Sequence, residues 1–394
     1  MQKALKPFFL LIFILTIGRL TQAQPKEKNL DQIRFSVEEA ANWSALFKRN
    51  TGWFGGDGIY SIPLNGKEQK TAGKNSTTLF IFSDSMIGQT TDSTMLPGYK
   101  MIHNAVGYLV GAEPVASKMK FYWQQKNNTF ESAFTPHTPK TNPADYFWLG
   151  DGFINHASNN SMYIFGYRVR NFSADAFGFK EVGNVIIKIP QNSSFPFTDQ
   201  KQLETPFYVD TAGTITSFGA GIFVNTTDAG AKKPDGYVYV YGVKGLAKEL
   251  LVARVQQKDF EDFTKWRFWT GTDWSAEMNQ CKAVTNSVSN ELSLSRLADG
   301  RYALIFQVGG MTTSVGMRLG ASPAGPFGPI IKLWDCSSDL KKKTYVVYNA
   351  KAHPTLSKPG ELLISYNINS TEFIKDLSTD PHLYRPRFIR VKFK

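Results

Sequence analysis

Cysteine and histidine are scarce in this sequence of 394 residues, which contains two cysteines and five histidines. Cys281 and Cys336 form no C-x-x-C motif and have no histidine at ligand spacing, which argues against a zinc site. Exported chains can form disulfides. The sequence therefore leaves open whether these two cysteines pair or remain free thiols.

Long apolar runs are also rare, and the clearest one lies at the N-terminus. Lys3 and Lys6 precede the apolar run 8–17, and the small residues Thr21 and Ala23 follow it. This order predicts a cleaved signal peptide over residues 1–23. The run is shorter than the ~20 residues of a membrane span, which disfavours an uncleaved anchor, and no cysteine follows it to carry a lipid. We expect a secreted or periplasmic protein with no integral membrane segment in the mature chain 24–394, which we interpret as one domain.

Basic runs with interleaved aromatics, the pattern of a nucleic-acid surface, are absent as well. The formal net charge is +12, from 45 Lys and Arg against 33 Asp and Glu, and such a charge suits anionic polymers. The lysine clusters at 232–233 and 341–343 instead resemble solvated loops. We therefore expect no nucleic-acid partner.

Aromatic residues and glycine are abundant. Phe, Tyr and Trp make up 14% of the chain, there are 32 glycines, and long helical patterns are few, which predicts an all-β protein. A hairpin pattern of a strand, a polar turn and an aromatic-rich return strand recurs. The five hairpins begin with G-D-G-I-Y-S (56–61), G-D-G-F-I-N (150–155), G-A-G-I-F-V (219–224), N-E-L-S-L-S-R (290–296) and A-H-P-T-L-S (352–357).

Each repeat continues into a third strand, and several add a Trp-bearing fourth one. Such units predict a five-bladed β-propeller. The fifth unit lacks an outer strand, and the segment 33–37 could supply it from the N-terminus and close the ring. A β-sandwich with a second domain is the alternative, but two sandwiches would not repeat one hairpin five times.

The first strand of each propeller blade lines the central channel, so equivalent positions on these strands converge. Alignment of the repeats places Asp57, Asp151, Ala220, Glu291 and His353 at one position. Return strands and third strands meet the same mouth of the channel. Their ends add candidate substrate-binding residues, namely Asp84, His103, Asn104, Arg168 and Arg318.

Clustered carboxylates have a chemical use. Like charges in a confined site raise one pKa, so that one group stays protonated while another is ionised. Glycoside hydrolysis needs such an acid and base pair. Each residue also has a structural interpretation: Gly-Asp-Gly is commonly a tight turn, Asp84 could cap a turn, and His353 could be a hydrogen-bonded core histidine.

Two stretches carry a resemblance to a known group. T-G-W-F-G-G-D-G-I-Y-S-I-P-L with T-L-F-I-F-S-D-S-M-I-G, and N-E-L-S-L-S-R-L-A-D-G-R-Y with S-P-A-G-P-F-G-P, resemble secreted bacterial five-bladed propellers catalogued as a domain of unknown function. Some relatives of that group are endo-D-arabinanases, and the likeness extends more loosely to furanosidase glycoside hydrolases. The resemblance implies that Asp57 is the base or nucleophile, that Asp151 sets a pKa, and that Glu291 is the acid. Ala220 departs from the acidic pattern.

The sequence thus favours a secreted glycoside hydrolase acting on a polysaccharide, such as furanosidic arabinan, with catalytic residues among Asp57, Asp151 and Glu291. No organic cofactor or metal is expected; a structural Ca²⁺ would suit acidic and carbonyl oxygens, but no calcium-loop spacing supports one. The alternative is a carbohydrate-binding propeller that cleaves nothing. A sialidase is disfavoured because its repeated S-x-D-x-G-x-x-W turns and arginine trio are missing.

Overall fold

The computed structural model describes residues 29–394 except 174, 176 and 177. The predicted signal peptide 1–23 lies outside the described residues. Within them, no helix is long and apolar enough to cross a membrane. Strands dominate, and the all-β prediction is confirmed.

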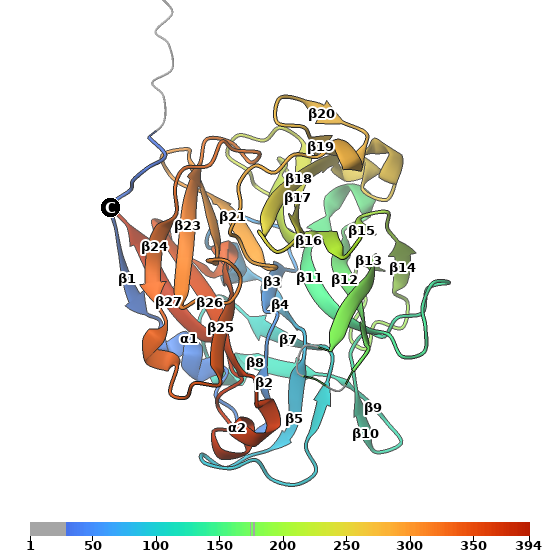
Figure 1. The fold of residues 1–394 in the computed structure, drawn as a ribbon, viewed down its shortest axis with the longest axis vertical. Helices are drawn as coiled ribbons and strands as arrows, with labels where there is room; N and C mark the ends of the chain where they lie inside the picture. Colours follow the sequence, from blue (N-terminus) through green and yellow to red (C-terminus); the bar gives the residue numbers. More distant parts are fainter. Residues whose placement is uncertain (1–28, 174, 176–177) are drawn as a thin grey trace, which may run out of the picture.

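Five antiparallel sheets of four or more strands make up most of the described chain (Figure 1). The first contains β3 (Tyr60–Pro63), β4 (Thr77–Phe82), β7 (Ala105–Val110) and β8 (Met119–Tyr122). The second contains β11 (Tyr146–Asn155), β12 (Ser161–Asn171), β13 (Phe179–Ile189) and β14 (Lys201–Glu204). The third has six strands: β15 (Tyr208–Thr211), β16 (Thr214–Asn225), β17 (Tyr237–Lys244), β18 (Glu249–Gln256), β19 (Arg267–Trp269) and β20 (Trp274–Ser275).

The fourth sheet contains β21 (Leu292–Arg296), β22 (Tyr302–Gln307), β23 (Ser314–Gly320) and β24 (Ile331–Asp335). The fifth contains β25 (Tyr345–Ala352), β26 (Glu361–Ser370), β27 (Arg387–Phe393) and the N-terminal strand β1 (Phe35–Glu39). β1 pairs antiparallel with β27, from Phe35 opposite Phe393 to Glu39 opposite Ile389. The predicted pairing of the N-terminal segment with the last strand is therefore confirmed.

Smaller elements connect these sheets. They are the sheet of β2 (Thr51–Gly56), β5 (Ser85–Gln89) and β6 (Lys100–Ile102), the hairpin of β9 (Gln124–Lys126) and β10 (Thr129–Glu131), and the helices α1 (Ala41–Leu46) and α2 (Phe373–Thr379). Short 3₁₀ helices are η1 (Ala72–Asn75), η2 (Ala116–Lys118), η3 (His156–Ser158), η4 (Gln257–Asp259), η5 (Phe263–Lys265), η6 (Met278–Gln280), η7 (Ser337–Asp339) and η8 (Pro354–Leu356).

The hydrophobic core lies between neighbouring sheets. Alternating apolar residues on each strand face the next sheet, as a two-residue period requires. One buried cluster joins sheets one and two through Ile62 and Phe147, and a similar one joins sheets four and five through Ile305 and Ile364. Another joins sheets five and one, where Phe388 packs with Phe80. The first strands β3, β11, β16, β21 and β25 consequently face a shared centre (Figure 1).

The fifth repeat differs from the prediction. Its first strand is β25, which ends at Ala352, and His353 begins the turn into η8. The alignment of His353 with Asp57 and Asp151 was therefore wrong. The A-H-P-T-L-S pattern placed the first strand at 352–357, whereas β25 ends at Ala352. The residues of β25 that meet the acidic groups are Tyr348, Asn349 and Lys351.

Candidate active site

Asp57 and Asp84 lie on neighbouring chain segments. Asp57 follows β2 and Asp84 precedes β5. The Asp57 backbone N–H donates to the Asp84 carbonyl at 3.2 Å, and the Ser83 N–H donates to the Asp57 carbonyl at 2.8 Å. Side chains that start from such adjacent backbones have Cβ atoms about 5 Å apart. The two carboxylates are therefore close neighbours.

The glycines of the first Gly-Asp-Gly motif permit this approach. Gly58 has φ +62°, a conformation that favours glycine, and a Cβ there would lie 2.5 Å from the Ser83 hydroxyl oxygen. In the second motif, a Cβ on Gly152 would lie 2.6 Å from the Tyr163 carbonyl oxygen. The motif brings an aspartate against a neighbouring strand, which explains why both glycines are needed.

Asp57 is held in a form that favours protonation at neutral pH. Burial, followed by the negative charge of Asp84, raises the pKa of Asp57 to about 8, and Glu291 adds to this effect. The Tyr348 hydroxyl donates to Asp57 Oδ2 at 2.5 Å and opposes the shift, as does Tyr384. Because the raising effects exceed the lowering ones, the Asp57 carboxyl group can hold a proton at neutral pH and donate it.

Asp84 has a different environment. Its Oδ1 lies 2.9 Å from His103 Nδ1 and accepts a hydrogen bond from Trp148 Nε1 at 3.0 Å. Its side chain is 19% exposed. Asp57 and Asp84 are thus neighbouring carboxyl groups with different hydrogen-bond partners.

Glu291 comes from the fourth sheet, just before β21, and forms an ion pair with the buried Lys351 of β25. Asn349 Nδ2 donates to its Oε1 at 2.7 Å. Burial raises the pKa of Glu291, and the Lys351 charge opposes that shift. Lys351 also lies over the Tyr60 ring, 4.7 Å from its centroid.

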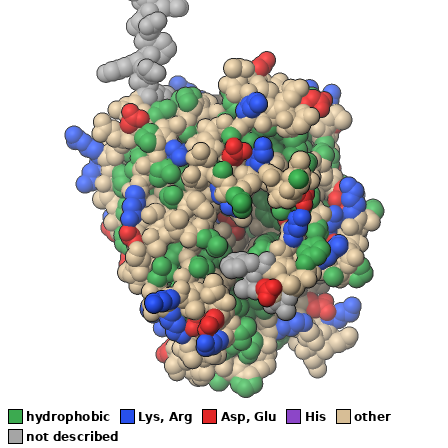
Figure 2. Space-filling view, in the orientation of Figure 1, with side chains coloured by type: hydrophobic (Ala, Val, Ile, Leu, Met, Phe, Trp, Pro, Cys, Tyr) green, Lys and Arg blue, Asp and Glu red, His purple; other side chains and the backbone are tan. Residues whose placement is uncertain are grey.

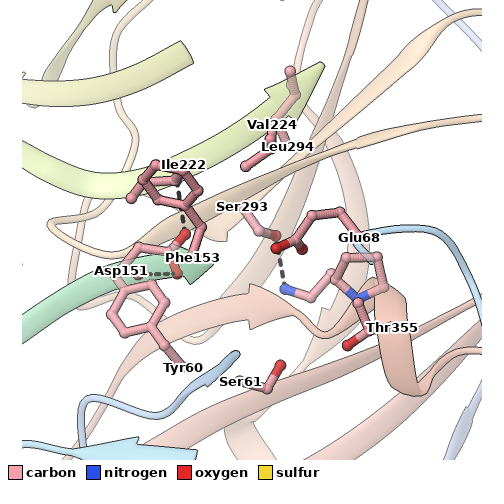
Figure 3. A pocket seen from close by; sticks show the side chains of 13 residues that line it. Tyr60, Ser61, Glu68, Asp151, Phe153, Ile222, Val224, Ser293, Leu294 and Thr355 are labelled. Atoms are coloured by element: carbon pink, nitrogen blue, oxygen red, sulfur yellow. Dashed lines mark hydrogen bonds between the residues drawn. The ribbon is translucent and has the colours of Figure 1, made fainter. Parts of the chain in front are cut away.

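Asp151 sits in an irregularity of β11 between Leu149 and Gly152. Its carboxylate accepts backbone hydrogen bonds from Ile222 at 2.7 Å and Gly152 at 2.8 Å (Figure 3). Burial raises the pKa of Asp151 to about 7, although these bonds and Lys351 lower it. Glu68 lies near it, and burial together with the Asp151 charge raises the pKa of Glu68 to about 8.

Asp151 and Glu68 line a small pocket between the first strands, together with Tyr60, Ser61, Ser293 and Thr355 (Figure 3). The volume of this pocket is about 40 Å³, which accommodates only a few water molecules. A sugar ring does not fit there. The pocket beside Asp151 therefore has no room for a substrate sugar.

His353 occupies a buried structural position. Its Nδ1 lies 2.9 Å from the Ser61 hydroxyl of β3, and its Nε2 lies 2.8 Å from the Ser365 hydroxyl of β26. Burial and the charge of Lys351 lower the pKa of His353 to about 3, so the ring is neutral. It links the fifth sheet to the first and has no contact with the acidic residues.

The remaining predicted binding residues divide into two groups. His103 lies against Asp84. Arg168 is buried in an ion pair with Glu204 at 2.6 Å, Asn104 bonds the Phe134 and Phe147 carbonyls, and Arg318 donates to the Gly328 carbonyl at 2.8 Å. These three side chains connect backbone segments or neighbouring strands.

The sequence-based prediction missed Tyr348, Lys351, Trp148 and Glu68, which complete the site. Tyr348 and Lys351 were missed because the fifth strand was assigned too late in the chain. The motif Y-F-W-L at 146–149 offered a signal, since its alternation places Tyr146 and Trp148 on one face of a strand. No comparable signal marks Glu68, which lies in a loop.

Metal and disulfide sites are not formed by the described residues. In residues 29–394, apart from the three undescribed positions, no group of three or more His, Cys, Asp or Glu side chains could hold a metal ion. Cys281 and Cys336 are both free thiols and belong to different core clusters.

This all-β architecture with an acidic centre has known relatives. The chain belongs to the family described as "Domain of unknown function (DUF5005)", whose model matches residues 40–393. The resemblance to a family catalogued as a domain of unknown function is thereby confirmed. No curated protein is significantly similar to the chain.

Solved structures are similar to the chain at low sequence identity. A candidate hydrolase from Bacteroides ovatus is 19% identical, with a TM-score of 0.69 over 93% of this chain and 97% of that one. An endo-arabinase from Bacteroides thetaiotaomicron is 12% identical, with a TM-score of 0.43 over 84% and 96%. An alpha-L-arabinofuranosidase from Clostridium thermocellum is 11% identical, with a TM-score of 0.42 over 84% and 88%.

Proposed function

We propose that this protein is a secreted glycoside hydrolase built on a five-bladed propeller. The five larger sheets would be the blades of one domain, with β1 completing the fifth. The substrate would be a neutral polysaccharide, with furanosidic arabinan as the first candidate. One observation carries this proposal: Asp57 and Asp84 are adjacent, and burial together with the charge of Asp84 holds Asp57 toward its protonated form.

The chemistry needs two carboxyl groups in opposite protonation states. Asp57, with a pKa of about 8, would protonate the leaving glycosidic oxygen. Asp84, oriented by His103 and Trp148, would attack the anomeric carbon or activate water. Tyr348 fixes the Asp57 carboxyl by its hydrogen bond, which reduces the entropy that positioning costs.

Glu291 and Asp151 have a supporting role in this proposal. Glu291 is engaged by Lys351 and Asn349, and Asp151 by two backbone N–H groups, so neither is free to exchange a proton with substrate. Their charges keep the potential at the centre negative, and Glu291 raises the pKa of Asp57. These roles differ from those implied by the furanosidase resemblance, in which Asp57 is the base and Glu291 the acid.

The test uses the purified mature protein and a panel of arabinan, arabinogalactan, xylan and levan. Asp57→Asn and Asp84→Asn should each lower hydrolysis by about 10²–10⁴-fold. Aryl glycosides with activated leaving groups separate the roles: Asp57→Asn should retain activity on them, because such groups leave without a proton, whereas Asp84→Asn should not.

A matched control is Asp339→Asn. Asp339 also accepts a tyrosine hydroxyl, from Tyr366 at 2.7 Å, but it lies in η7, between the fourth and fifth sheets. This variant should hydrolyse like the parent. If Glu291→Gln shows the leaving-group dependence and Asp57→Asn does not, the assignment of roles is wrong. If the parent binds a glycan and cleaves none, the protein is the non-catalytic carbohydrate-binding propeller.

A further inference from the structure

At the start of β11, one face of the strand presents aromatic rings beside Asp84. Tyr146 and Trp148 alternate with Phe147 and Leu149, which are fully buried in the core at 0% and 1% exposure. Tyr146 and Trp148 are only half-buried. The same strand continues to Asp151. Aromatic rings that are left partly open next to a polar centre offer a flat apolar surface with a polar edge.

The rings are held in fixed orientations. Tyr146 stacks on His103 with centroids 3.7 Å apart and an interplanar angle of 16°. Trp148 meets Tyr146 edge-on at 6.1 Å, and its Nε1–H bonds Asp84. The Tyr146 hydroxyl donates to Asn171 Oδ1 at 2.8 Å. A platform with little rotamer freedom loses little entropy when a ligand binds.

The cations near this platform are already paired. Arg168 binds Glu204 at 2.6 Å, and Arg170 binds Asp145 at 2.7 Å. A negatively charged sugar would therefore meet the Asp84 carboxylate without a compensating unpaired arginine from this group. The charge distribution favours a neutral sugar ring. The face of the molecule in Figure 2 is hollowed near its centre, and both hydrophobic and charged side chains lie around the hollow.

We propose that Tyr146 and Trp148 form a subsite that stacks a neutral sugar unit of the glycan next to the unit held at Asp57 and Asp84. This inference rests on the proposed function only where it places the scissile bond at Asp57 and Asp84. The binding of the sugar to the two rings does not depend on hydrolysis. The C–H face of the sugar would lie on the rings, and its hydroxyls would reach Asp84 and His103. The subsite would make the protein prefer chains over single sugars.

Binding can be measured without cleavage in the Asp57→Asn background. Affinity electrophoresis and calorimetry with arabinan, arabinogalactan, xylan and levan serve as the probes. Tyr146→Leu keeps apolar bulk and removes the ring, and it should weaken binding about ten-fold, which corresponds to about 1.4 kcal/mol. Trp148→Phe keeps a ring and should bind within about two-fold of the parent.

Trp274→Ala is the control. Trp274 is a half-buried tryptophan that pairs with Trp269 on the β19–β20 hairpin of the third sheet, remote from Asp84 in the sheet order. It should bind glycan like the parent. In the catalytically intact protein, Tyr146→Leu should raise KM with little change in kcat. The lost contact stabilises the bound substrate and the transition state equally. Trp148→Phe should lower kcat, because Asp84 loses the Nε1–H donor.

The outcomes distinguish this inference from the hydrolase proposal. If glycan binds and Tyr146→Leu weakens it while nothing is cleaved, the subsite stands and the hydrolase proposal fails. If the parent cleaves glycan and Tyr146→Leu changes neither KM nor affinity, the subsite is wrong and the hydrolase stands. Absence of binding to every glycan of the panel overturns the subsite as well.

Discussion

Lys351 is the buried cation that pairs with Glu291, and replacing it should lower the free energy of unfolding by a measurable amount. Its side chain is 1% exposed, and the side chain of its partner Glu291 is 12% exposed. Lys351 also lowers the pKa of Asp151. Replacing one member of a buried ion pair leaves the other charge uncompensated, which costs about 3–5 kcal/mol. Because Glu291 is not fully enclosed, we expect Lys351→Met to lose about 3 kcal/mol of unfolding free energy at pH 8.

The loss should depend on pH in a definite direction. Burial already raises the pKa of Glu291, and without Lys351 the folded-state pKa rises further. A raised folded-state pKa means that the folded protein binds more protons than the unfolded chain. The variant is therefore least affected below the unfolded carboxyl pKa of about 4.3. It loses stability progressively as the pH rises toward the folded-state pKa.

Thermal unfolding at pH 5 and pH 8 measures both effects. A loss of about 3 kcal/mol lowers Tm by roughly 6 °C in a large domain, where 1 kcal/mol corresponds to about 2 °C. The shift at pH 5 should be clearly smaller than at pH 8. Lys351→Met with Glu291→Gln should recover most of the loss, because no unpaired charge remains.

Lys188→Met is the control, since Lys188 and Glu261 form a pair whose side chains are 25% and 39% exposed. It should cost less than about 1 kcal/mol. Equal Tm shifts at pH 5 and pH 8 for Lys351→Met, or a shift no larger than that of Lys188→Met, would refute the reasoning.

Three further predictions concern the aspartate pair. The kcat/KM of the free protein should fall as pH rises through about 8, where Asp57 loses its proton, and Asp57→Asn should abolish this alkaline limb in a pH–rate profile. The close approach of Asp57 and Asp84 predicts a retaining outcome, for which carboxyl groups lie about 5–5.5 Å apart; proton NMR of the first-formed anomer checks it, and inversion contradicts it. Gly58→Ala should lower Tm more than Gly360→Ala, because both have positive φ but only Gly58 has Ser83 within 2.5 Å of an added Cβ; equal shifts would show that the contact is unimportant.

The strand pattern was predictable from the sequence because it depends on local chemistry. Two-residue alternation, Asp-Gly and Pro-Gly turns and the return strands identify the hairpins, and the free N-terminal segment identifies β1 as the partner of β27. The fifth hairpin failed for a physical reason. β25 contains the half-polar run Y-V-V-Y-N-A-K-A, in which the buried Lys351 and the two consecutive half-buried residues Tyr348 and Asn349 hide the strand periodicity.

The positions of the acidic residues could be anticipated, but their partners could not. Asp57, Asp84, Asp151 and Glu291 belong to repeats, and repeats converge. Whether a carboxylate is free or engaged depends on contacts between residues far apart in the chain. Tyr348 reaches Asp57 across 291 positions, and Asn349 reaches Glu291 across 58. Sequence spacing carries no information about such pairs.

The two Gly-Asp-Gly motifs have the same sequence, but their aspartates have different hydrogen-bond donors. Both place an aspartate where a glycine lets neighbouring backbone approach, so both aspartates are buried and their pKa values rise to about 8 and about 7. The difference lies in the donors. Asp151 receives two backbone N–H groups and stands beside a pocket too small for sugar, whereas Asp57 receives side-chain hydroxyls and stands beside Asp84. Backbone donors cannot move with a reacting group, but hydroxyl donors can rotate as a proton leaves. The first motif therefore suits the proton transfer that we propose, whereas the second holds its aspartate in one orientation.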